Sequence, residues 1–550
     1  PENTCETSGS CIGCNLIYSG NHYEALEKDS YGKFRFVAGI NPRSFSWQLA
    51  PGEAFYTPEA VLNFSADGFR GLSGQLHSFI REHIVRGVWK HKPRPVLLNS
   101  WEACYFKIDE KKLLQLAKAG KDAGIELFVM DDGWFLGRND DTSSLGDWEP
   151  DPKKLPGGIA SLSKKIKELG MDFGIWVEPE MISENSNLYK EHPDWAMKIP
   201  GHPHSEGRNQ CILDLCNPEV RKYVIEEMTR VFSSGDIRYA KWDMNRIFSD
   251  IYAPSLPEER QGETAHRYVL GLYHIMDELT TRFPEILFEG CSSGGNRFDL
   301  GILSYFPQIW ASDNTDALCR TGIQNSYSYG YPLSVFTAHV SSCPNHQTLR
   351  ITPLETRFQV ASFGVLGYEC NLKDLSGSDL NAIREQIALY KKWRDVFQFG
   401  SFYRGAENEA SDSETLSWTC VSPDGRRAVG LFFRRLTTPN QSHDWYRPVG
   451  LLPDVKYHFY GRNIKYNLKD FGDLVNTVSP VHIKQGSALQ EILSRFVNMD
   501  GEKEELTAYG DTLMRAGIAL KPAFAGTGYN SDTRLFPDFS SRIYFMEAAE

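Results

Sequence analysis

The stretch IRYAKWDMNR, residues 237–246, starts as an apolar strand and ends in a lysine, a carboxylate and an asparagine. Lys241 and Asp243 are two residues apart, so on a strand their side chains project from the same face. The two charges therefore form a buried ion pair or line a space in which a ligand binds. A cation beside an aspartate favours the ionised form, which is the form that a nucleophile needs.

Seven further apolar runs of the same kind lie on either side of this one along the chain. They span residues 95–102, 125–134, 172–181, 285–295, 307–316, 332–340 and 358–368. Helical runs with one apolar face separate them, and Gly124 is placed to end the first of these helices. Buried strands that alternate with helices indicate a parallel sheet covered by helices, and eight such units predict a closed (β/α)8 barrel of the α/β class. An open doubly wound sheet is the alternative, but no G-x-G-x-x-G motif follows an early strand.

The pattern changes on both sides of the predicted barrel. In residues 401–550, short alternating runs are separated by Gly, Asp, Asn and Pro turns, which predicts an antiparallel C-terminal β-sandwich. Residues 1–75 are also β-rich but are too few for a complete domain of their own. We therefore expect three parts: residues 1–75, the barrel at 76–400 and the C-terminal β-sandwich at 401–550.

Composition and charge narrow the possible partners. The chain is 41% hydrophobic and 24% charged and has a net charge of −12, without a basic block or a long apolar run. We therefore expect neither a nucleic acid nor a membrane as a partner. An aromatic share of 13% suits the stacking of sugars, although a large aromatic β core would explain it as well.

Several features bear on where the protein resides. The sequence starts PENTCETSG, without an initiator Met or a signal-peptide pattern, which indicates a processed product or part of a longer chain. Eleven cysteines and two glycosylation tripeptides, at Asn63 and Asn440, favour a secreted, extracellular glycoprotein over the cytoplasmic alternative. Cys5, Cys11 and Cys14 could form half of a zinc site, but no neighbouring fourth ligand completes it.

Polar or aromatic residues end nearly every predicted strand, at the edge where such barrels bind their ligands. They are Trp101, Asp131, Asp132, Trp176, Glu178, Lys241, Asp243, Cys291 and Asp313. One such residue could cap a helix or complete an ion pair, but several together indicate a binding pocket.

A pair of carboxylates in such a pocket can break a glycosidic bond. Retaining enzymes hold the two carboxyl groups roughly 5–5.5 Å apart and inverting enzymes roughly 6.5–9.5 Å apart. Asp243, beside a lysine, suits the nucleophile, and Asp313, after an apolar stretch that raises its pKa, suits the general acid. Arg208 and the remaining acids would hold sugar hydroxyls through charge-assisted hydrogen bonds.

Several motifs occur together in one order: LNSWEACYF (98–106), DDGWF (131–135), GIWVEPEMI (174–182), KWDMNR (241–246), EGCSSGGNRFDLGIL (289–303) and SDNTDA (312–317). In these motifs the chain resembles the bacterial and fungal α-galactosidases of glycoside hydrolase family 36, from about residue 16 to the C-terminus. The resemblance implies a retaining hydrolase of terminal α-galactosyl residues in oligosaccharides such as melibiose, raffinose and stachyose. It also implies that residues 1–75 are the tail of a larger N-terminal β-sandwich domain.

The same resemblance implies roles for individual residues. Asp243 would be the nucleophile and Asp313 the acid/base, while Asp131 and Asp132 would grip hydroxyls of a terminal galactose. The other implied substrate contacts are Arg208, Lys241, Asn245 and Cys291, with Trp101 and Trp176 as walls. Members of the family use no metal or organic cofactor, and many assemble as homotetramers.

Three other functions stay open at this point. A raffinose-synthase-like galactosyl transferase would share both carboxylates and differ in whether a sugar or water reaches the intermediate. An α-N-acetylgalactosaminidase would need more room near the 2-position of the sugar. A catalytically dead sugar-binding protein would have lost one of the carboxylates, and both are present.

Overall fold

Eight parallel strands form a closed barrel in this computed structural model, which describes residues 3–205, 207–406, 413–438, 443–477, 479–494, 496–522 and 535–549. The strands are β5 (Leu97–Asn99), β6 (Leu127–Met130), β7 (Asp172–Val177), β10 (Ile237–Trp242), β11 (Leu287–Gly290), β12 (Gln308–Trp310), β13 (Phe336–Ser341) and β14 (Val365–Glu369). They follow one another around the barrel in sequence order, and β7 pairs with β10 to continue the circle. The predicted closed (β/α)8 barrel is thus confirmed, and the open sheet is excluded.

Helices cover the outside of the barrel. They are α3 (Glu110–Ala123), α4 (Gly158–Glu168), α6 (Pro218–Ser233), α7 (Thr264–Arg282), α9 (Ala317–Tyr327), α10 (Leu354–Ser362) and α11 (Gly377–Phe399). Asp109 caps the start of α3 by accepting a hydrogen bond from the Lys112 amide at 2.8 Å. Gly124 ends this helix at the predicted position with a φ of 97°, a left-handed conformation that glycine adopts without strain.

The strand predicted at residues 358–368 is partly wrong. Residues 358–362 belong to α10, and the strand that follows begins only at Val365. These helical residues are buried on every side, so their run of small and apolar side chains has no polar face to reveal the helical period. A short, fully buried segment has the same apolar sequence pattern whether it forms a strand or a helix.

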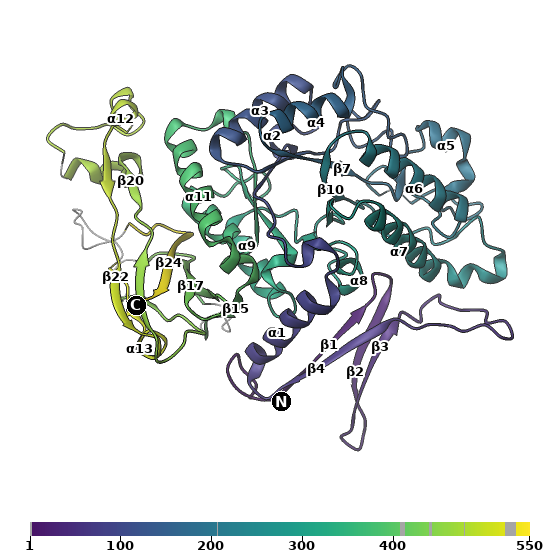
Figure 1. Cartoon of the computed structure of the whole chain (residues 1–550), viewed down its shortest axis with the longest axis horizontal. Helices are drawn as coiled ribbons and strands as arrows, with labels where there is room; N and C mark the ends of the chain where they lie inside the picture. Colours follow the sequence, from purple (N-terminus) through teal and green to yellow (C-terminus); the bar gives the residue numbers. More distant parts are fainter. Residues whose placement is uncertain are drawn as a thin grey trace.

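The C-terminal part is built on an antiparallel sheet, as predicted. Its six strands, in spatial order, are β15 (Ser401–Arg404), β16 (Thr415–Val421), β17 (Arg427–Arg434), β24 (Ser540–Ala548), β19 (Lys456–Gly461) and β22 (Glu505–Tyr509). The short pair β18 (Trp445–Tyr446) and β23 (Ile518–Ala519) covers one face through Tyr446 and Ile518, which share a core with Tyr544. Helix α11 covers the opposite face, where Trp393 packs on Phe545 at 4.9 Å between ring centres (Figure 1).

The N-terminal residues form two small antiparallel sheets, which lie below the barrel in Figure 1. One pairs β1 (Cys11–Ile17) with β4 (Glu59–Ser65), and the other pairs β2 (His22–Lys28) with β3 (Phe34–Ile40). The helix α1 (Gly68–Phe79) then leads into the barrel. A buried ion pair between Glu6 and Arg404 of β15, 2.9 Å long, joins this region to the C-terminal sheet.

Three further observations concern sequence predictions. The amide nitrogen of Asn63 donates to the Leu72 carbonyl at 3.2 Å and to Gln75 at 3.1 Å, whereas Asn440 lies outside the described residues. Each of the eleven cysteines is free rather than paired in a disulfide. None of the described helices has the length and apolar character needed to cross a bilayer. The predicted limits of the three parts stay a prediction.

Candidate active site

Most of the predicted site residues follow the carboxyl ends of barrel strands and so meet at one mouth of the barrel. Asp131 and Asp132 follow β6, Asp243 follows β10, Cys291 follows β11 and Asp313 lies three residues after β12. All of these except Asp313 are buried. The mouth is therefore lined with carboxylates that are largely withdrawn from water.

Lys241 pairs with Asp131. Its Nζ donates to Asp131 Oδ2 at 3.0 Å, and the same oxygen accepts from Asn99 Nδ2 at 2.7 Å. Burial is the largest single influence and disfavours the charged amine, but the negative neighbours together, with Asp131 first among them, hold the pKa of Lys241 well above its usual value. The lysine is thus a fixed positive charge at the base of the mouth, and Asp243 is a more distant neighbour than Asp131.

Asp132 is held by an arginine that the sequence interpretation missed. Arg138 reaches both carboxylate oxygens, with Nε 3.0 Å from Oδ1 and Nη2 2.8 Å from Oδ2. Burial raises the pKa of Asp132, and the guanidinium of Arg138 opposes that rise. The pair fixes Asp132 in one orientation, with the remaining lone pairs of its oxygens available for a hydroxyl.

Asp243 receives three hydrogen bonds that fix both of its oxygens. Trp176 Nε1 and Asn245 Nδ2 donate to Oδ2 at 3.1 and 2.8 Å, and the Met244 amide donates to Oδ1 at 2.9 Å. Trp176, predicted as a wall, is fully buried and therefore orients this carboxylate as well. Asn245, predicted as a substrate contact, is partly buried and bonded to Ser293 at 3.1 Å through its own oxygen.

Glu178 lies behind Asp243 and differs from it in charge. Burial, and after it the negative charge of Asp243, raises the pKa of Glu178 to about 8, so this group is protonated at neutral pH. Its oxygens face the Asn245 amide and Gln210 Nε2, the latter at 3.2 Å. Gln210 Oε1 is buried without a partner among the described residues, so rotating that amide by half a turn lets the Glu178 hydroxyl donate to it.

Asp313 lies at the open side of the mouth. Trp310 Nε1 donates to its Oδ1 at 2.8 Å, and loss of hydration followed by the negative charge of Asp243 raises its pKa. The residue is nevertheless exposed, so water in the mouth moderates this rise. Its backbone rests on Gly294, where a Cβ atom would come within 2.8 Å of the Asp313 nitrogen.

Cys291 follows β11 and is buried in the same mouth as the predicted nucleophile and general acid. Burial comes first among the causes that raise its thiol pKa well above the usual value, and the charges of Asp243 and Asp313 add to it. Both charges act on this one buried thiol, so Cys291 belongs to the same mouth as the two carboxylates. Their roles as nucleophile and general acid stay predictions.

Two predicted residues stand apart from this constellation. Arg208 is exposed on the segment before β9 (Cys211–Ile212), and within the described ranges no hydrogen bond or ion pair joins it to the carboxylates. Trp101 begins the short helix α2 (Trp101–Cys104) and packs edge-on against Tyr105 and Phe106, at 5.3 and 5.1 Å between ring centres. Their roles as substrate contact and wall stay predictions.

A buried network supports the mouth and was not predicted. Glu180 accepts from Trp242 Nε1 at 2.8 Å and from two nitrogens of Arg297 at 2.9 and 2.7 Å. Glu180 and Arg297 lie in the same motifs as the predicted residues, but motif membership alone cannot separate a supporting ion pair from a substrate contact. The grouping of potential metal ligands found in the described part of the chain, Glu184, His204 and Cys211, includes none of the carboxylates of the mouth.

An open hollow of about 930 Å³ adjoins the loop that carries Asp313. Its lining includes Ser312 and Asn314 on either side of that residue, with Ser293 and the rings of Tyr327 and Tyr331. Its lining includes none of the predicted site residues, so the hollow lies beside the Asp313 loop and α9 rather than among the carboxylates of the mouth.

Known proteins resemble this chain along its whole length. The family called Melibiase matches residues 54–400, and the N-terminal and C-terminal domains of glycosyl hydrolase family 36 match residues 1–50 and 415–546. Alpha-galactosidase AgaA of Geobacillus stearothermophilus is 46% identical over 463 residues, which cover 84% of this chain and 63% of that protein. Alpha-galactosidase 1 of Pediococcus pentosaceus is 47% identical over 454 residues, covering 82% of this chain and 62% of that protein.

Solved structures give the same result. The crystal structure of AgaA superposes with a TM-score of 0.87 at 41% identity, covering 100% of this chain and 68% of that one. Variants of AgaA have been solved in complex with raffinose and with stachyose. The chain thus spans less than two thirds of the length of the relatives that it matches by sequence.

Proposed function

The chain belongs to the Melibiase family, glycosyl hydrolase family 36. We propose on this basis that it acts as a retaining exo-α-galactosidase. The substrates would be terminal, non-reducing α-galactosyl residues of oligosaccharides such as melibiose, raffinose and stachyose. Raffinose and stachyose occupy solved variants of the relative AgaA, which supports this substrate class.

The contrast between Asp243 and Asp313 carries the proposal. Asp243 is buried and fixed by three donors, whereas Asp313 has a raised pKa and faces the open side of the mouth. In the first step Asp243 attacks the anomeric carbon while Asp313 gives its proton to the leaving oxygen. In the second step Asp313 takes a proton from water, which displaces Asp243 and releases galactose.

Selection for galactose would rest on the charged groups at the base of the mouth. Asp131 and Asp132 are buried acceptors, and the fixed amine of Lys241 is a donor beside them. A site built to pair with a hydroxyl rejects an epimer because its buried groups then lose a partner. We assign these three residues to galactosyl hydroxyls, among them the C4 hydroxyl that distinguishes galactose from glucose.

Parallel assays with melibiose, raffinose and sucrose test the function. We expect galactose from melibiose and raffinose and no cleavage of sucrose. Transfer of galactose to a second sugar in place of water would favour the galactosyl transferase. Sugar binding without turnover would favour a binding protein, and faster cleavage of an α-N-acetylgalactosaminide would favour that hydrolase.

We further propose that the protein acts as a homo-oligomer, because the family resemblance implies a homotetramer. Ile12 of β1 pairs with Phe64 of β4, and both are exposed together with Leu62. Apolar side chains gathered on one face of a small sheet support an interface there.

For the location, we propose an extracellular protein on the strength of its two glycosylation tripeptides. The side-chain nitrogen of Asn63, to which a glycan would be attached, already donates two hydrogen bonds. A glycan there would have to break them. Mass spectrometry of the native protein decides: a glycan on either tripeptide supports secretion, and two unmodified asparagines argue for the cytoplasmic alternative.

A further inference from the structure

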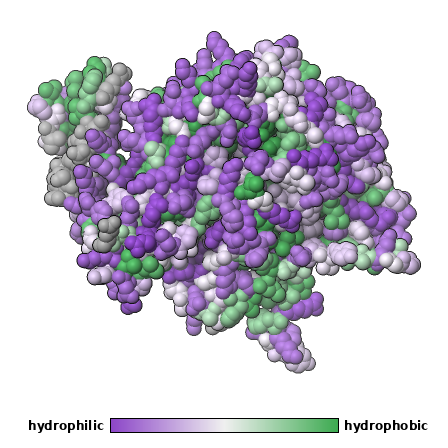
Figure 2. All heavy atoms as spheres, viewed as in Figure 1, coloured by the Kyte–Doolittle hydropathy of each residue, from purple (hydrophilic) through white to green (hydrophobic). Residues whose placement is uncertain are grey.

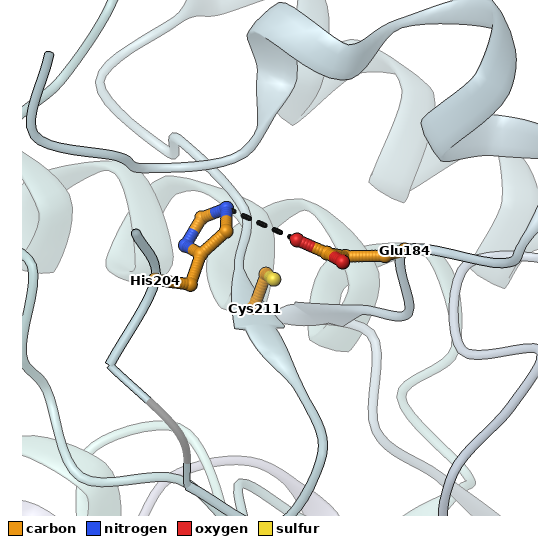
Figure 3. A group of neighbouring side chains, drawn as sticks. All are labelled: Glu184, His204 and Cys211. Atoms are coloured by element: carbon orange, nitrogen blue, oxygen red, sulfur yellow. Dashed lines mark ion pairs between the residues drawn. The ribbon is translucent and has the colours of Figure 1, made fainter. Parts of the chain in front are cut away.

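Three side chains of metal-binding types come together in the segment between β7 and α6. The ligand atoms of Glu184, His204 and Cys211 all lie within 4.8 Å of one another, and His204 Nε2 is 3.7 Å from Glu184 Oε1. Figure 3 shows the imidazole and the carboxylate facing each other, with the sulfur beside the gap between them. Strands β8 (Met181–Ile182) and β9 form a wide hairpin whose connection spans residues 183–210. In it Ile182 pairs with Cys211, which brings Cys211 close to Glu184.

The imidazole of His204 lacks the partners that a buried polar group requires. Only 10% of its side chain is exposed, and neither ring nitrogen has a hydrogen-bond partner among the described residues. Buried nitrogens without a partner are rare because their loss of hydration is uncompensated. The arrangement is explained if a bound ion supplies the missing contact.

The other ring nitrogen of His204 faces a carboxylate, at a distance longer than a hydrogen bond. His204 Nδ1 faces Asp250 Oδ2 at 3.8 Å, and Arg246 fixes that carboxylate through an ion pair of 2.9 Å. A proton on Nδ1, directed at Asp250, leaves the lone pair on Nε2, the nitrogen that faces Glu184. A carboxylate behind a histidine orients and strengthens it as a ligand.

We propose that Glu184, His204 and Cys211 bind one zinc ion, with water as the fourth ligand. Tetrahedral zinc with bonds of about 2.0–2.3 Å sets neighbouring ligand atoms roughly 3.3–3.8 Å apart. His204 Nε2 and Glu184 Oε1 already have this spacing at 3.7 Å, and the remaining ligand-atom distances, within 4.8 Å, need to shorten by at most about an ångström. Imidazole and thiolate ligands select zinc over calcium or magnesium, which prefer oxygen.

Such an ion would tie the loop that carries Arg208 to the β8–β9 hairpin. His204 lies in that loop, Cys211 is in β9, and Glu184 comes two residues after β8. The site lies outside the carboxylates of the mouth, so its existence is independent of the proposed glycosidase activity.

Zinc binding is measured on chelator-treated protein, by calorimetric titration with zinc chloride and by the metal content after dialysis. We expect about one ion per chain, and more than about 10-fold weaker binding in His204→Ala and in Cys211→Ser. His202→Ala and Cys216→Ser are matched controls, because His202 is exposed in the same loop and Cys216 lies just beyond the hairpin. Both controls should bind zinc as the unchanged protein does.

Cobalt substitution and thermal unfolding give two further readouts that need no substrate. Cobalt should produce a sulfur-to-metal charge-transfer band that Cys211→Ser abolishes, and zinc should raise the Tm of the unchanged protein but not of that variant. Circular dichroism confirms that each variant is folded. Absence of zinc binding, or equal binding in His204→Ala and Cys211→Ser, would overturn the proposal.

Discussion

At the residue scale, the ion pair of Lys241 and Asp131 is almost entirely withdrawn from water. Removing one partner of a buried pair usually costs about 3–5 kcal/mol, because the other charge is left uncompensated. We therefore expect Lys241→Met to lower the free energy of unfolding by that amount and to reduce kcat/KM sharply. Denaturant unfolding and assays on an α-galactoside measure both effects.

The double variant Lys241→Met with Asp131→Asn separates stability from function. Both charges are then gone and Asn99 keeps an acceptor, so most of the stability should return while activity stays low. If Lys241→Met alone has normal stability and activity, the lysine only fills space.

Glu178 predicts how stability depends on pH. Its pKa is about 8 in the folded protein against 4.5 in an unfolded chain, so between these values the folded protein holds a proton that the unfolded chain has released. This contribution to the free energy of unfolding is fully present below pH 4.5 and is lost as the pH rises through about 8. Glu178→Gln cannot ionise, so its unfolding free energy should fall less steeply across that window. Equal pH slopes for the two proteins would contradict the assignment.

At the scale of single elements, close packing between barrel strands limits the side chain at Gly367 of β14. A Cβ atom there would lie 2.4 Å from His339 Cδ2 and 2.9 Å from Leu97 Cδ1. The His339 ring cannot move aside easily, because Glu369 holds its Nδ1 at 2.8 Å. We expect Gly367→Ala to destabilise the fold by about 1–3 kcal/mol, measured by denaturant unfolding.

A matched glycine serves as the control for that substitution. Gly322 lies inside α9, and a Cβ atom there meets nothing within 4 Å. Gly322→Ala should therefore stabilise the protein by about 0.5–1 kcal/mol, since alanine favours the helix. Equal effects at the two positions would show that strand packing does not limit Gly367.

The elements also show how far sequence reasoning reaches. Long periodic segments such as α6 and α7 were predictable because their apolar faces repeat with the helical period. The helix α10 was not, because burial on every side removes that period. The β8–β9 hairpin escaped prediction since its two strands have only two residues each, so the approach of His204 to Cys211 could not be foreseen.

In the mouth, too, some features were predictable from the sequence and others were not. Asp131, Asp132, Asp243 and Asp313 were predictable because barrel strands bring their carboxyl ends to one edge. Which groups pair with each other depends on side-chain reach across the barrel: Lys241 extends past β7 to Asp131. The sequence shows only that Lys241 is two residues from Asp243, and this spacing does not reveal how far the lysine side chain extends across the barrel.

At the scale of the whole molecule, the N-terminal strands expose apolar side chains that the barrel does not cover. Ile12, Leu62 and Phe64 are 74%, 68% and 58% exposed, and Figure 2 shows hydrophobic residues at the lower surface of the molecule. If this face forms the proposed interface, light scattering should give a mass above that of one chain. Leu62→Lys with Phe64→Lys should then shift the protein to smaller species.

Ile492→Lys is the control for this experiment, because Ile492 is an exposed apolar residue at α12 (Ala488–Leu493), in the C-terminal part. It should leave the mass unchanged. A single-chain mass for the unchanged protein would contradict the proposed oligomer.

The account as a whole depends on a double displacement carried out by Asp243 and Asp313. Each displacement inverts the anomeric carbon, so two in succession return the original configuration. Proton NMR of galactose in the first minutes of melibiose hydrolysis, before the anomers equilibrate, reads this outcome directly. The account predicts that α-galactose appears first and β-galactose only later, by mutarotation; early β-galactose would contradict it.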